Sequence, residues 1–531
     1  MEWWKERVVY QIYPRSFMDS NGDGIGDIRG IISRLDYLRD LGVGVIWLSP
    51  VYKSPDADNG YDISDYCSVD PKFGTMGDMD ALFAEAEKRD IKIIMDLVIN
   101  HTSDEHEWFA KSRLNHPTYR DYYIWSDKPN NWDTFFMEDA WTFDEVRGQY
   151  YLHLFHKKQP DLNYKNPKVL QEIKQVLRFW LDKGAAGFRC DVINVLYKND
   201  LKDAKQRLVL TGLEKYKTTE GCHQILRELR TVLDEYDCFT VGETVMVDLP
   251  EAKSLCDAER RELNMIFHFD HLEVDRRVAK YIPKRFKASK LLRILEKWQR
   301  GLEWDAVYFE NHDQPRIVSH YGDTSTLELW KRSAKLLATL EFTLSGTPFV
   351  YQGQEIGMTN FDFTSIEQLN DVESRNMDKM LRDMRIPKKL RWKWISEASR
   401  DNARTPMQWD ASENAGFTSG TPWLGVNSNY KTINYEAQRD NLDSVLTYYK
   451  KMIKLRSGSD VLKYGEFIPA LADDRVMAYV KKRGDDLIGV VLNFSNTSVK
   501  ARIDGEIVIS NTDRYKLNGT LLPYEAIVVR L

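Results

Sequence analysis

The chain alternates between two hydrophobic patterns over most of its length. Short continuous runs of apolar and β-branched residues recur eight times, at residues 8–13, 43–48, 91–99, 186–193, 238–245, 265–269, 305–310 and 347–353. The segments between them carry apolar residues three and four positions apart, which is typical of amphipathic helices. Buried strands that alternate with helices form parallel sheets, and eight such units close a barrel. We therefore predict an α/β fold built on a (β/α)8 TIM barrel, in which 265–269 is the weakest strand.

Two stretches interrupt this alternation. Residues 101–165, which follow the third predicted strand, contain 15 aromatic residues and little helical periodicity. From residue 459 on, short β-like runs are separated by turn residues, which favours an antiparallel arrangement. We predict a barrel formed by 1–100 and 166–458, an inserted subdomain B at 101–165 over its mouth, and a C-terminal β-sandwich domain at 459–531.

Composition and charge exclude several classes of protein. The 531 residues are 42% hydrophobic, too apolar for disorder, and the net charge of −6 comes without a basic stripe for nucleic acid. No run is long enough to cross a bilayer, and charges interrupt the first residues where a signal peptide would be apolar, so we expect no membrane association and a cytoplasmic location. The five cysteines lack metal-ligand spacing and indicate neither disulfides nor zinc.

Polar residues end four of the predicted strands, where catalytic groups gather in such a barrel. They are Asp96, Asn100 and His101 on the third, Arg189 and Asp191 on the fourth, Glu243 on the fifth, and residues 310–313 on the seventh. Arg189 would hold Asp191 ionised, because residues two apart on a strand share a face. Glu243 ends an apolar strand, which would favour its protonated form. A single strand-end carboxylate is more often a cap or an ion pair, but this combination is what glycoside hydrolysis requires.

The motifs at these positions resemble the signature regions of the alpha-amylase family of glycoside hydrolases. They are DLVINH (96–101), QPDLN (159–163), GFRCDVIN (187–194), GETV (242–245) and ENHDQ (310–314). Within the family, QIYPRSF (11–17), DNGYDISDY (58–66) and ARTPMQW (403–409) resemble the oligo-1,6-glucosidase subfamily of α-glucosidases, isomaltases and dextran glucosidases. The resemblance implies a retaining mechanism with Asp191 as nucleophile, Glu243 as acid and then base, and Asp313 as stabiliser of the transition state.

The same resemblance implies a pocket for the non-reducing glucose. Its residues would be Asp58, Tyr61, His101, Arg189, His312 and Arg404, with Phe155 and Gln159 from the insertion nearby. Asp58 and Arg404 together would bind the terminal hydroxyls and close the pocket into a blind end, which means exo-action. Glu373 matches a position that helps α-1,6 enzymes bind the next sugar, and Val192, directly after the nucleophile, also resembles them.

We therefore expect a hydrolase that acts on a small α-glucoside, releasing α-1,6-linked glucose from isomaltose and isomaltooligosaccharides. The alternatives are an α-1,4-glucosidase, a trehalose-6-phosphate hydrolase, or a sucrose isomerase or glucosyltransferase that uses the same glucosyl-enzyme intermediate. A phosphate could meet Lys284, Arg285 and Lys287, although solvated loop charges are the simpler interpretation. The segment at 272–286 does not match the arginine-rich loop of sucrose isomerases. A non-catalytic amylase-like binding protein would lack part of the carboxylate set.

A separate loop has the spacing of a calcium site. Oxygen ligands would come from Asp19, Asn21, Asp23, Asp27 and the backbone carbonyl of Ile25. The glutamate of a full EF-hand is absent, since the twelfth position from Asp19 is Gly30. Such loops often form only turns, but the subfamily often holds calcium here. We expect a structural calcium ion, no organic cofactor, and a monomer.

Overall fold

The computed structural model describes residues 2–207, 209–276, 280–501, 504–516 and 519–531. Its centre is a parallel sheet of eight strands in the order β11-β10-β9-β5-β2-β1-β13-β12. They are β1 (Val9–Ile12), β2 (Val45–Leu48), β5 (Lys92–Leu97), β9 (Gly187–Cys190), β10 (Phe239–Glu243), β11 (Met265–Phe267), β12 (Ala306–Tyr308) and β13 (Thr347–Tyr351). Each predicted apolar run, including 265–269, contains one of these strands, which confirms the predicted barrel.

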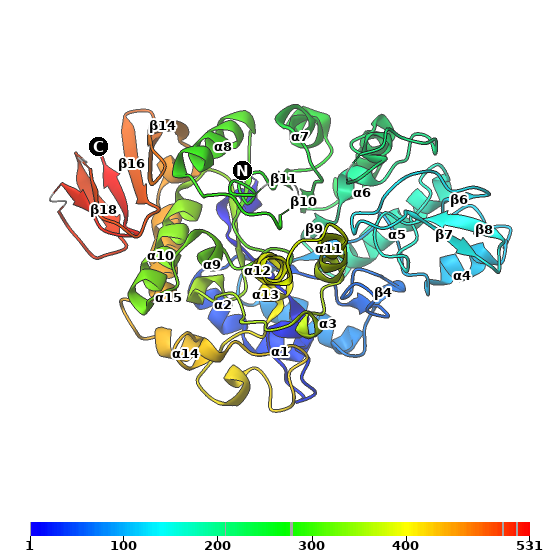
Figure 1. Ribbon diagram of the computed structural model, residues 1–531, viewed down its shortest axis with the longest axis horizontal. Helices are drawn as coiled ribbons and strands as arrows, with labels where there is room; N and C mark the ends of the chain where they lie inside the picture. The colour runs from blue at the N-terminus through cyan, green and yellow to red at the C-terminus, as the bar shows by residue number, and fades with distance from the viewer. Residues whose placement is uncertain (1, 208, 277–279, 502–503, 517–518) are drawn as a thin grey trace.

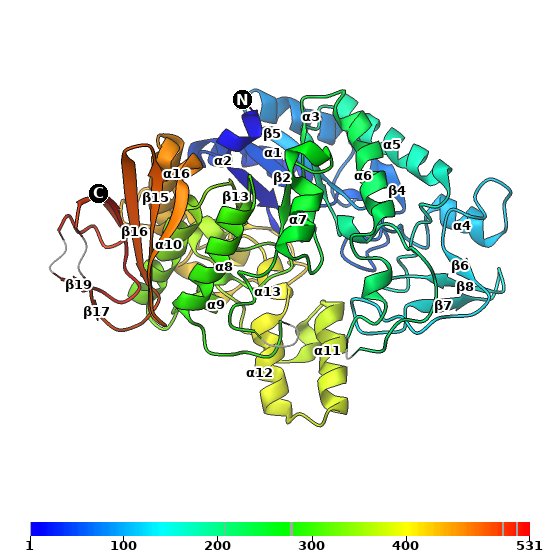
Figure 2. The ribbon, with the colours of Figure 1, turned by 90° about the horizontal axis from the view of Figure 1, so that it is seen from above.

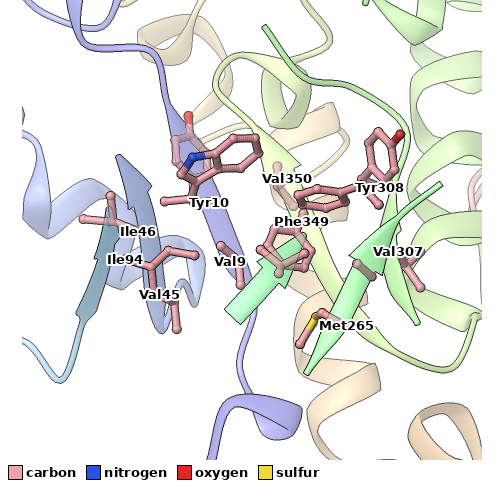
Figure 3. Packing of buried hydrophobic residues seen from close by; sticks show 14 of the residues in the cluster. Val9, Tyr10, Val45, Ile46, Ile94, Met265, Val307, Tyr308, Phe349 and Val350 are labelled. Atoms are coloured by element: carbon pink, nitrogen blue, oxygen red, sulfur yellow. The ribbon is translucent and has the colours of Figure 1, made fainter. Parts of the chain in front are cut away.

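The edge strands β11 and β12 lie side by side and bring the sheet close to closure. Phe267 at the end of β11 packs against Tyr308 at the end of β12, with 4.9 Å between ring centroids. Figure 3 shows part of the packing around the strands, where Val9, Phe349 and Val350 approach one another. The barrel interior is therefore a packed core, and the space for a ligand lies at its end.

Helices surround the barrel (Figure 1). They are α1 (Ile28–Ser33), α2 (Leu35–Leu41), α3 (Met76–Glu87), α5 (Pro167–Asp182), α6 (Glu220–Leu233), α7 (Leu249–Cys256), α8 (Ala288–Gly301), α9 (Ile317–Tyr321), α10 (Leu327–Thr343) and α15 (Val445–Ser457). Helix α5 illustrates how the sequence encodes them. The Asn166 side chain caps its first turn and Pro167 occupies its first position, while Val169, Ile173 and Val176 form its buried face.

The segment after β5 contains helix α4 (Glu107–Arg113) and a small antiparallel sheet in the order β6-β8-β7. The strands are β6 (Trp125–Ser126), β7 (Trp141–Asp144) and β8 (Gln149–Leu152). Many of its aromatic rings pack on one another, as when Phe109 stacks on Trp125 at 5.5 Å and meets Tyr151 edge-on at 5.2 Å. The aromatic density of this segment thus largely reflects its own core. A short pair, β3 (Tyr52–Lys53) and β4 (Asp65–Val69), precedes it.

A helical hairpin between β13 and α15 was not predicted from the sequence. Helices α11 (Val372–Asp383) and α12 (Lys388–Ala398) pack against each other and project from the body of the molecule (Figure 2). Met377, Leu381 and Ile395 form part of its own buried cluster. The short helices α13 (Asp401–Arg404) and α14 (Tyr435–Gln438) follow. The base of this hairpin carries Glu373 toward the barrel mouth.

The C-terminal part consists of α16 (Asp460–Tyr464) and an antiparallel sheet in the order β14-β15-β16-β20-β18. The strands are β14 (Glu466–Ala472), β15 (Val476–Arg483), β16 (Asp486–Asn493), β18 (Glu506–Ser510) and β20 (Ala526–Arg530), with the separate pair β17 (Val499–Lys500) and β19 (Thr520–Leu521). The antiparallel β-domain is as predicted, whereas the exact domain boundaries stay predictions. Over the described ranges, no helix combines the length and apolar character that a membrane span needs.

Candidate active site

A cavity of about 560 Å³ opens at the C-terminal ends of the barrel strands. Most residues predicted for catalysis or substrate binding line it, namely Asp58, Tyr61, His101, Phe155, Gln159, Asp191, Glu243, Asp313 and Glu373. The other three, Arg189, His312 and Arg404, are buried and bonded to these lining residues. The structure therefore brings the whole predicted set together from segments more than 300 positions apart in the sequence.

Arg189 on β9 is the centre of the carboxylate group, and its side chain is 1% exposed. Its Nη1 lies 2.7 Å from Asp191 Oδ1 and 2.8 Å from Asp96 Oδ1, and its Nη2 lies 2.6 Å from Glu243 Oε2. Burial raises the pKa of Asp191 well above its ordinary value; Arg189 opposes this shift, while Glu243 and Asp96 reinforce it. The sequence suggested that Arg189 would serve Asp191, whereas in the structure three carboxylates share its guanidinium.

Glu243 does not lie in the apolar surroundings expected from its strand. Its Oε2 accepts hydrogen bonds from Arg189 and, at 3.3 Å, from the backbone N–H of Val192. Val192 has φ +37° and ψ +42°, a left-handed conformation that is strained for a β-branched residue. The strained peptide directly after Asp191 thus turns its N–H toward the second carboxylate.

Asp313, on the loop after β12, is surrounded by nitrogen donors. Its Oδ1 lies 2.6 Å from Arg404 Nη2 and 3.4 Å from Arg400 Nη1, and its Oδ2 lies 3.3 Å from His312 Nε2. Burial raises the pKa of Asp313, but His312, Arg400 and Arg404 outweigh it and hold this pKa well below its usual range. Asp313 is therefore an ionised acceptor, suited to hydroxyl groups.

The rings of Tyr61 and His312 stack in the wall of the site. Their centroids are 5.2 Å apart and their planes differ by 4°. Gln11 Nε2 lies 2.8 Å from His312 Nδ1, and burial lowers the pKa of His312 to about 3. His312 is therefore neutral near pH 7, and its position is fixed by its neighbours.

A second hydrogen-bonded group continues the wall on the other side of Tyr61's peptide, through its carbonyl. Gln159 Nε2 donates to Asp58 Oδ2 at 3.3 Å and to the Tyr61 carbonyl at 3.2 Å, and it lies 3.1 Å from His101 Nε2. The Phe155 ring packs on His101 with 5.2 Å between centroids. These contacts join the segment at 58–66, the end of β5 and subdomain B in one surface.

The cation beside Asp58 is Arg400, whereas the sequence analysis expected Arg404. Arg400 Nη2 lies 3.6 Å from Asp58 Oδ1, and its Nε lies 2.8 Å from Asp371 Oδ1. Arg404 instead contacts Asp313 and donates from Nε to the His312 carbonyl at 3.0 Å. The two arginines lie at the two ends of the short helix α13 and share Asp313, but only Arg400 also reaches Asp58. Residues four apart on a helix are neighbours, so the position of Arg400 relative to Arg404 could have indicated it from the sequence.

Lys280 is a further residue that the sequence analysis missed. Its Nζ lies 2.8 Å from Glu373 Oε2, and both side chains line the cavity. It belongs to a loop outside every motif, so the sequence offered no signal for it.

Two buried donors beside Asp313 make no hydrogen bond, namely Arg400 Nη2 and Arg404 Nη1. Because buried polar groups are normally paired, these donors indicate a site shaped for a polar ligand. Of these two arginines, Arg400 lines the cavity together with Asp58 and Asp313, so that a donor stands beside two acceptors. Such a surface matches the hydroxyl groups of a sugar.

The predicted calcium loop is tied together by its own hydrogen bonds. Asp19 Oδ1 accepts from the N–H of Asn21 at 2.9 Å, Asn21 Oδ1 from that of Asp23 at 2.9 Å, and Asp23 Oδ1 from that of Ile25 at 2.8 Å. Asp27 caps α1 through Gly30. Among the described residues, no three His, Cys, Asp or Glu side chains converge as a metal site. A cation here would therefore need Asn21 and the Ile25 carbonyl as well.

Carboxylates bridged by an arginine, beside a third carboxylate ringed by donors at the mouth of a (β/α)8 barrel, define the chain as a glycoside hydrolase. Residues 11–465 match the family model for the alpha-amylase catalytic domain, and the chain belongs to the alpha-amylase family.

Individual relatives are similar over almost their whole length. The oligo-1,6-glucosidase of Parageobacillus thermoglucosidasius is 49% identical, over 96% of this chain and 95% of that protein. The trehalose-6-phosphate hydrolase of Bacillus licheniformis has a similar structure, with a TM-score of 0.94 and 42% identity over 100% of both chains. A variant isomaltulose synthase of Erwinia rhapontici, solved with its natural substrate sucrose, gives a TM-score of 0.96 and 41% identity over 99% of both chains.

Proposed function

We propose that the protein is an exo-acting, retaining α-glucosidase that hydrolyses non-reducing-end α-1,6-linked glucose from isomaltose and isomaltooligosaccharides. The observation that carries this proposal is the pair of carboxylates, Asp191 and Glu243, at the C-terminal ends of the adjacent strands β9 and β10 and bridged by one guanidinium. Such close spacing suits a nucleophile and an acid, because an inverting enzyme keeps its carboxyl groups about 6.5–9.5 Å apart to admit water. The name of the relative from Parageobacillus thermoglucosidasius supports the linkage.

The reaction follows from the placement of these groups. An Asp191 oxygen attacks the anomeric carbon while the glycosidic bond breaks, and Glu243 gives its proton to the leaving oxygen. Water then loses a proton to Glu243 and attacks the same carbon, which releases Asp191 and glucose. Asp313 stays ionised and accepts hydrogen bonds from the sugar as positive charge develops on the ring.

Exo-action is supported by the deeply buried side chains that line one part of the cavity. Asp58, held by Gln159 and approached by Arg400, lies there with Tyr61 and His101. These side chains leave acceptors and donors for the terminal hydroxyls of one glucose. A longer glucan would have to leave through the side that carries Glu373 and Lys280.

The linkage preference is supported by Val192 and Glu373, which both line the cavity. Of the alternatives, a phosphate-binding role for Lys287 is disfavoured, because its Nζ lies 2.8 Å from Asp474 Oδ2 in the C-terminal part. The segment at 272–286, compared with sucrose isomerases, includes residues 277–279, which lie outside the described residues. An α-1,4-glucosidase would differ from the proposed enzyme only in how the second sugar is oriented.

A substrate panel tests the proposal. The protein is incubated separately with isomaltose, maltose, sucrose, trehalose and trehalose 6-phosphate, and the products are identified. We expect glucose from isomaltose at the highest kcat/KM, and a loss of at least about 1,000-fold in Glu243→Gln. Preferred cleavage of maltose would contradict the linkage, isomaltulose from sucrose would indicate an isomerase, and unchanged hydrolysis by the variant would contradict the assignment of Glu243.

We also propose that the loop at 19–27 binds a calcium ion away from the cavity, through Asp19, Asn21, Asp23, the Ile25 carbonyl and Asp27. The Asp19 and Asp23 oxygens that accept backbone hydrogen bonds in the loop each keep a second lone pair, which can bind a cation. Chelation with EGTA should then lower the Tm, and added calcium should restore it only if Asp23 is intact. An identical Tm in EGTA and calcium would contradict this site.

We also propose that the protein is a monomer in the cytoplasm. The reducing compartment is supported by the five cysteines, which are all free thiols. Sedimentation at micromolar concentration tests the oligomeric state, and a dimer mass would contradict the proposal. Fractionation of the source cells tests the compartment.

A further inference from the structure

Asp96 is the third carboxylate on Arg189, and the catalytic steps above do not use it. It lies on β5, directly opposite Arg189 of β9 in the parallel ladder, and it is 0% exposed. It does not line the cavity, and it contacts the site through Arg189 and through the hydroxyl of Tyr61. Of these two contacts, only the guanidinium of Arg189 also contacts the catalytic carboxylates Asp191 and Glu243.

The hydrogen bonds around Asp96 identify its charge state. Oδ1 accepts from Arg189 Nη1 at 2.8 Å, and Oδ2 accepts from Trp47 Nε1 and the Tyr61 hydroxyl, each at 3.1 Å. Burial raises the pKa of Asp96 above its ordinary value, although Arg189, Trp47 and Tyr61 oppose this shift. Arginine and tryptophan nitrogens can only donate, so each carboxylate oxygen already faces a donor that cannot accept a proton. This pattern fits an ionised Asp96.

Asp96 competes with the two catalytic carboxylates for the positive charge of Arg189, and the other groups around the guanidinium carry no charge. Asp191 directly follows β9 and Glu243 ends β10, and both contact the guanidinium. The rings of Trp47 and Tyr61 lie 5.1 Å and 5.8 Å from it. His312 is neutral near pH 7 because of its burial. One positive charge is therefore divided among three carboxylates.

We propose that Asp96 is a positioning residue that withholds part of the charge of Arg189 from Asp191 and Glu243, and so sets the pH range of activity. The inference rests on the proposed function. If Asp96 were neutral, Arg189 would stabilise the ionised forms of both catalytic carboxylates more strongly. Asp191 would then ionise at lower pH, because the negative charge of Asp96 also raises the pKa of Asp191 directly.

The pH dependence of kcat/KM for Asp96→Asn tests this role, with 4-nitrophenyl α-glucoside as substrate. We expect the acid limb of the bell-shaped profile, which follows the ionisation of Asp191, to move about one pH unit toward acid, so that activity below the acid limb of the wild type rises up to about tenfold relative to the optimum. Trp47→Phe is the matched control, since it removes a hydrogen bond to Asp96 and keeps its charge. Its kcat should fall while both limbs stay in place.

An Asp96→Asn profile that keeps the acid limb of the wild type, at any activity, would overturn the inference. Asp96→Ser removes the same charge with a smaller side chain and is measured in parallel, with circular dichroism to confirm folding. Carbon-13 NMR of the aspartate carboxyls identifies Asp96 by the signal that disappears in these variants: a signal that stays ionised from pH 5 to 8 in the wild type supports the inference, and a protonated one in that range would overturn it.

The same assay separates this inference from the proposed function. Hydrolysis by the wild type, lost in Glu243→Gln, supports the function independently of Asp96. An active wild type with an unshifted Asp96→Asn profile refutes the role of Asp96 alone. A wild type that cleaves no α-glucoside refutes the function and with it the inference.

Discussion

Val192 combines a strained backbone with a buried side chain at the edge of the cavity. Its left-handed φ of +37° directs its N–H to Glu243, and its side chain packs in a cluster with Ile124 and Leu154 of the inserted segment. The residue thus fixes the geometry between the two catalytic carboxylates. Its side chain also lines the cavity together with Asp191 and Glu243.

Shortening this side chain should relax the linkage preference. In Val192→Ala we expect the ratio of kcat/KM for maltose to that for isomaltose to rise about tenfold, because one or two methyl groups are worth about 1–3 kcal/mol of discrimination. Val195→Ala is the matched control, since Val195 belongs to the same buried cluster and does not line the cavity. An unchanged ratio in the first variant, or an equal change in the second, would contradict this role.

At the scale of elements, Asp371 fastens the helical hairpin to the active site. It caps α11 through the N–H of Glu373 at 3.1 Å and pairs with Arg400 Nε at 2.8 Å. Burial raises its pKa, but Arg400, Arg404 and Lys280 outweigh that effect and hold the pKa well below its ordinary value. The ionised side chain therefore stabilises the fold above the pKa of the unfolded chain, and this stability is lost as the pH falls through the lower pKa of the folded state.

Neutralising Asp371 should loosen the hairpin. We expect Asp371→Asn to reduce the free energy of unfolding of this region at pH 7 by about 3–5 kcal/mol, because Arg400 loses its buried partner. The KM for isomaltose should rise, since Glu373 and Arg400 lose their support. Thermal unfolding and steady-state kinetics measure both effects, with the exposed Asp383→Asn at the end of α11 as control. Equal behaviour of the two variants would count against this account.

The elements that could be predicted from the sequence are those whose pattern is local. The barrel strands are continuous apolar runs, and the motifs place Asp191, Glu243 and Asp313 at their ends. The hairpin was missed because α11 and α12 are largely charged and bury only a few apolar residues. The sharing of Arg189 was missed because it depends on the register between β5 and β9, which no single stretch of sequence records.

At the scale of the whole molecule, a buried carboxyl couples stability to pH away from the cavity. Glu355 is fully buried; its Oε1 accepts hydrogen bonds from Tyr10 of β1 and Tyr37 of α2, and its Oε2 has no hydrogen-bond partner. Burial raises its pKa to about 7, against the hydrogen bonds of these tyrosines. A raised carboxyl pKa means that the stability is complete below the unfolded pKa and declines as pH rises toward 7.

Glu355→Gln should remove this pH dependence. Between pH 5 and pH 8 the wild type should lose roughly 3 kcal/mol more unfolding free energy than the variant, on the basis of about 1.4 kcal/mol per pKa unit. Thermal unfolding at the two pH values measures the difference, and Glu145→Gln on the surface is the control. A parallel decline in wild type and Glu355→Gln would show that other groups govern the effect.

The central claim is that Asp191 and Glu243 cleave an α-1,6 bond with retention of configuration. Proton NMR of methyl α-isomaltoside during the first minutes of hydrolysis tests it directly, because the only free anomeric carbon is the one released from the non-reducing end. The account predicts that α-glucose appears first and the β-anomer follows only by mutarotation. Initial release of β-glucose, or no release of glucose at all, would contradict it.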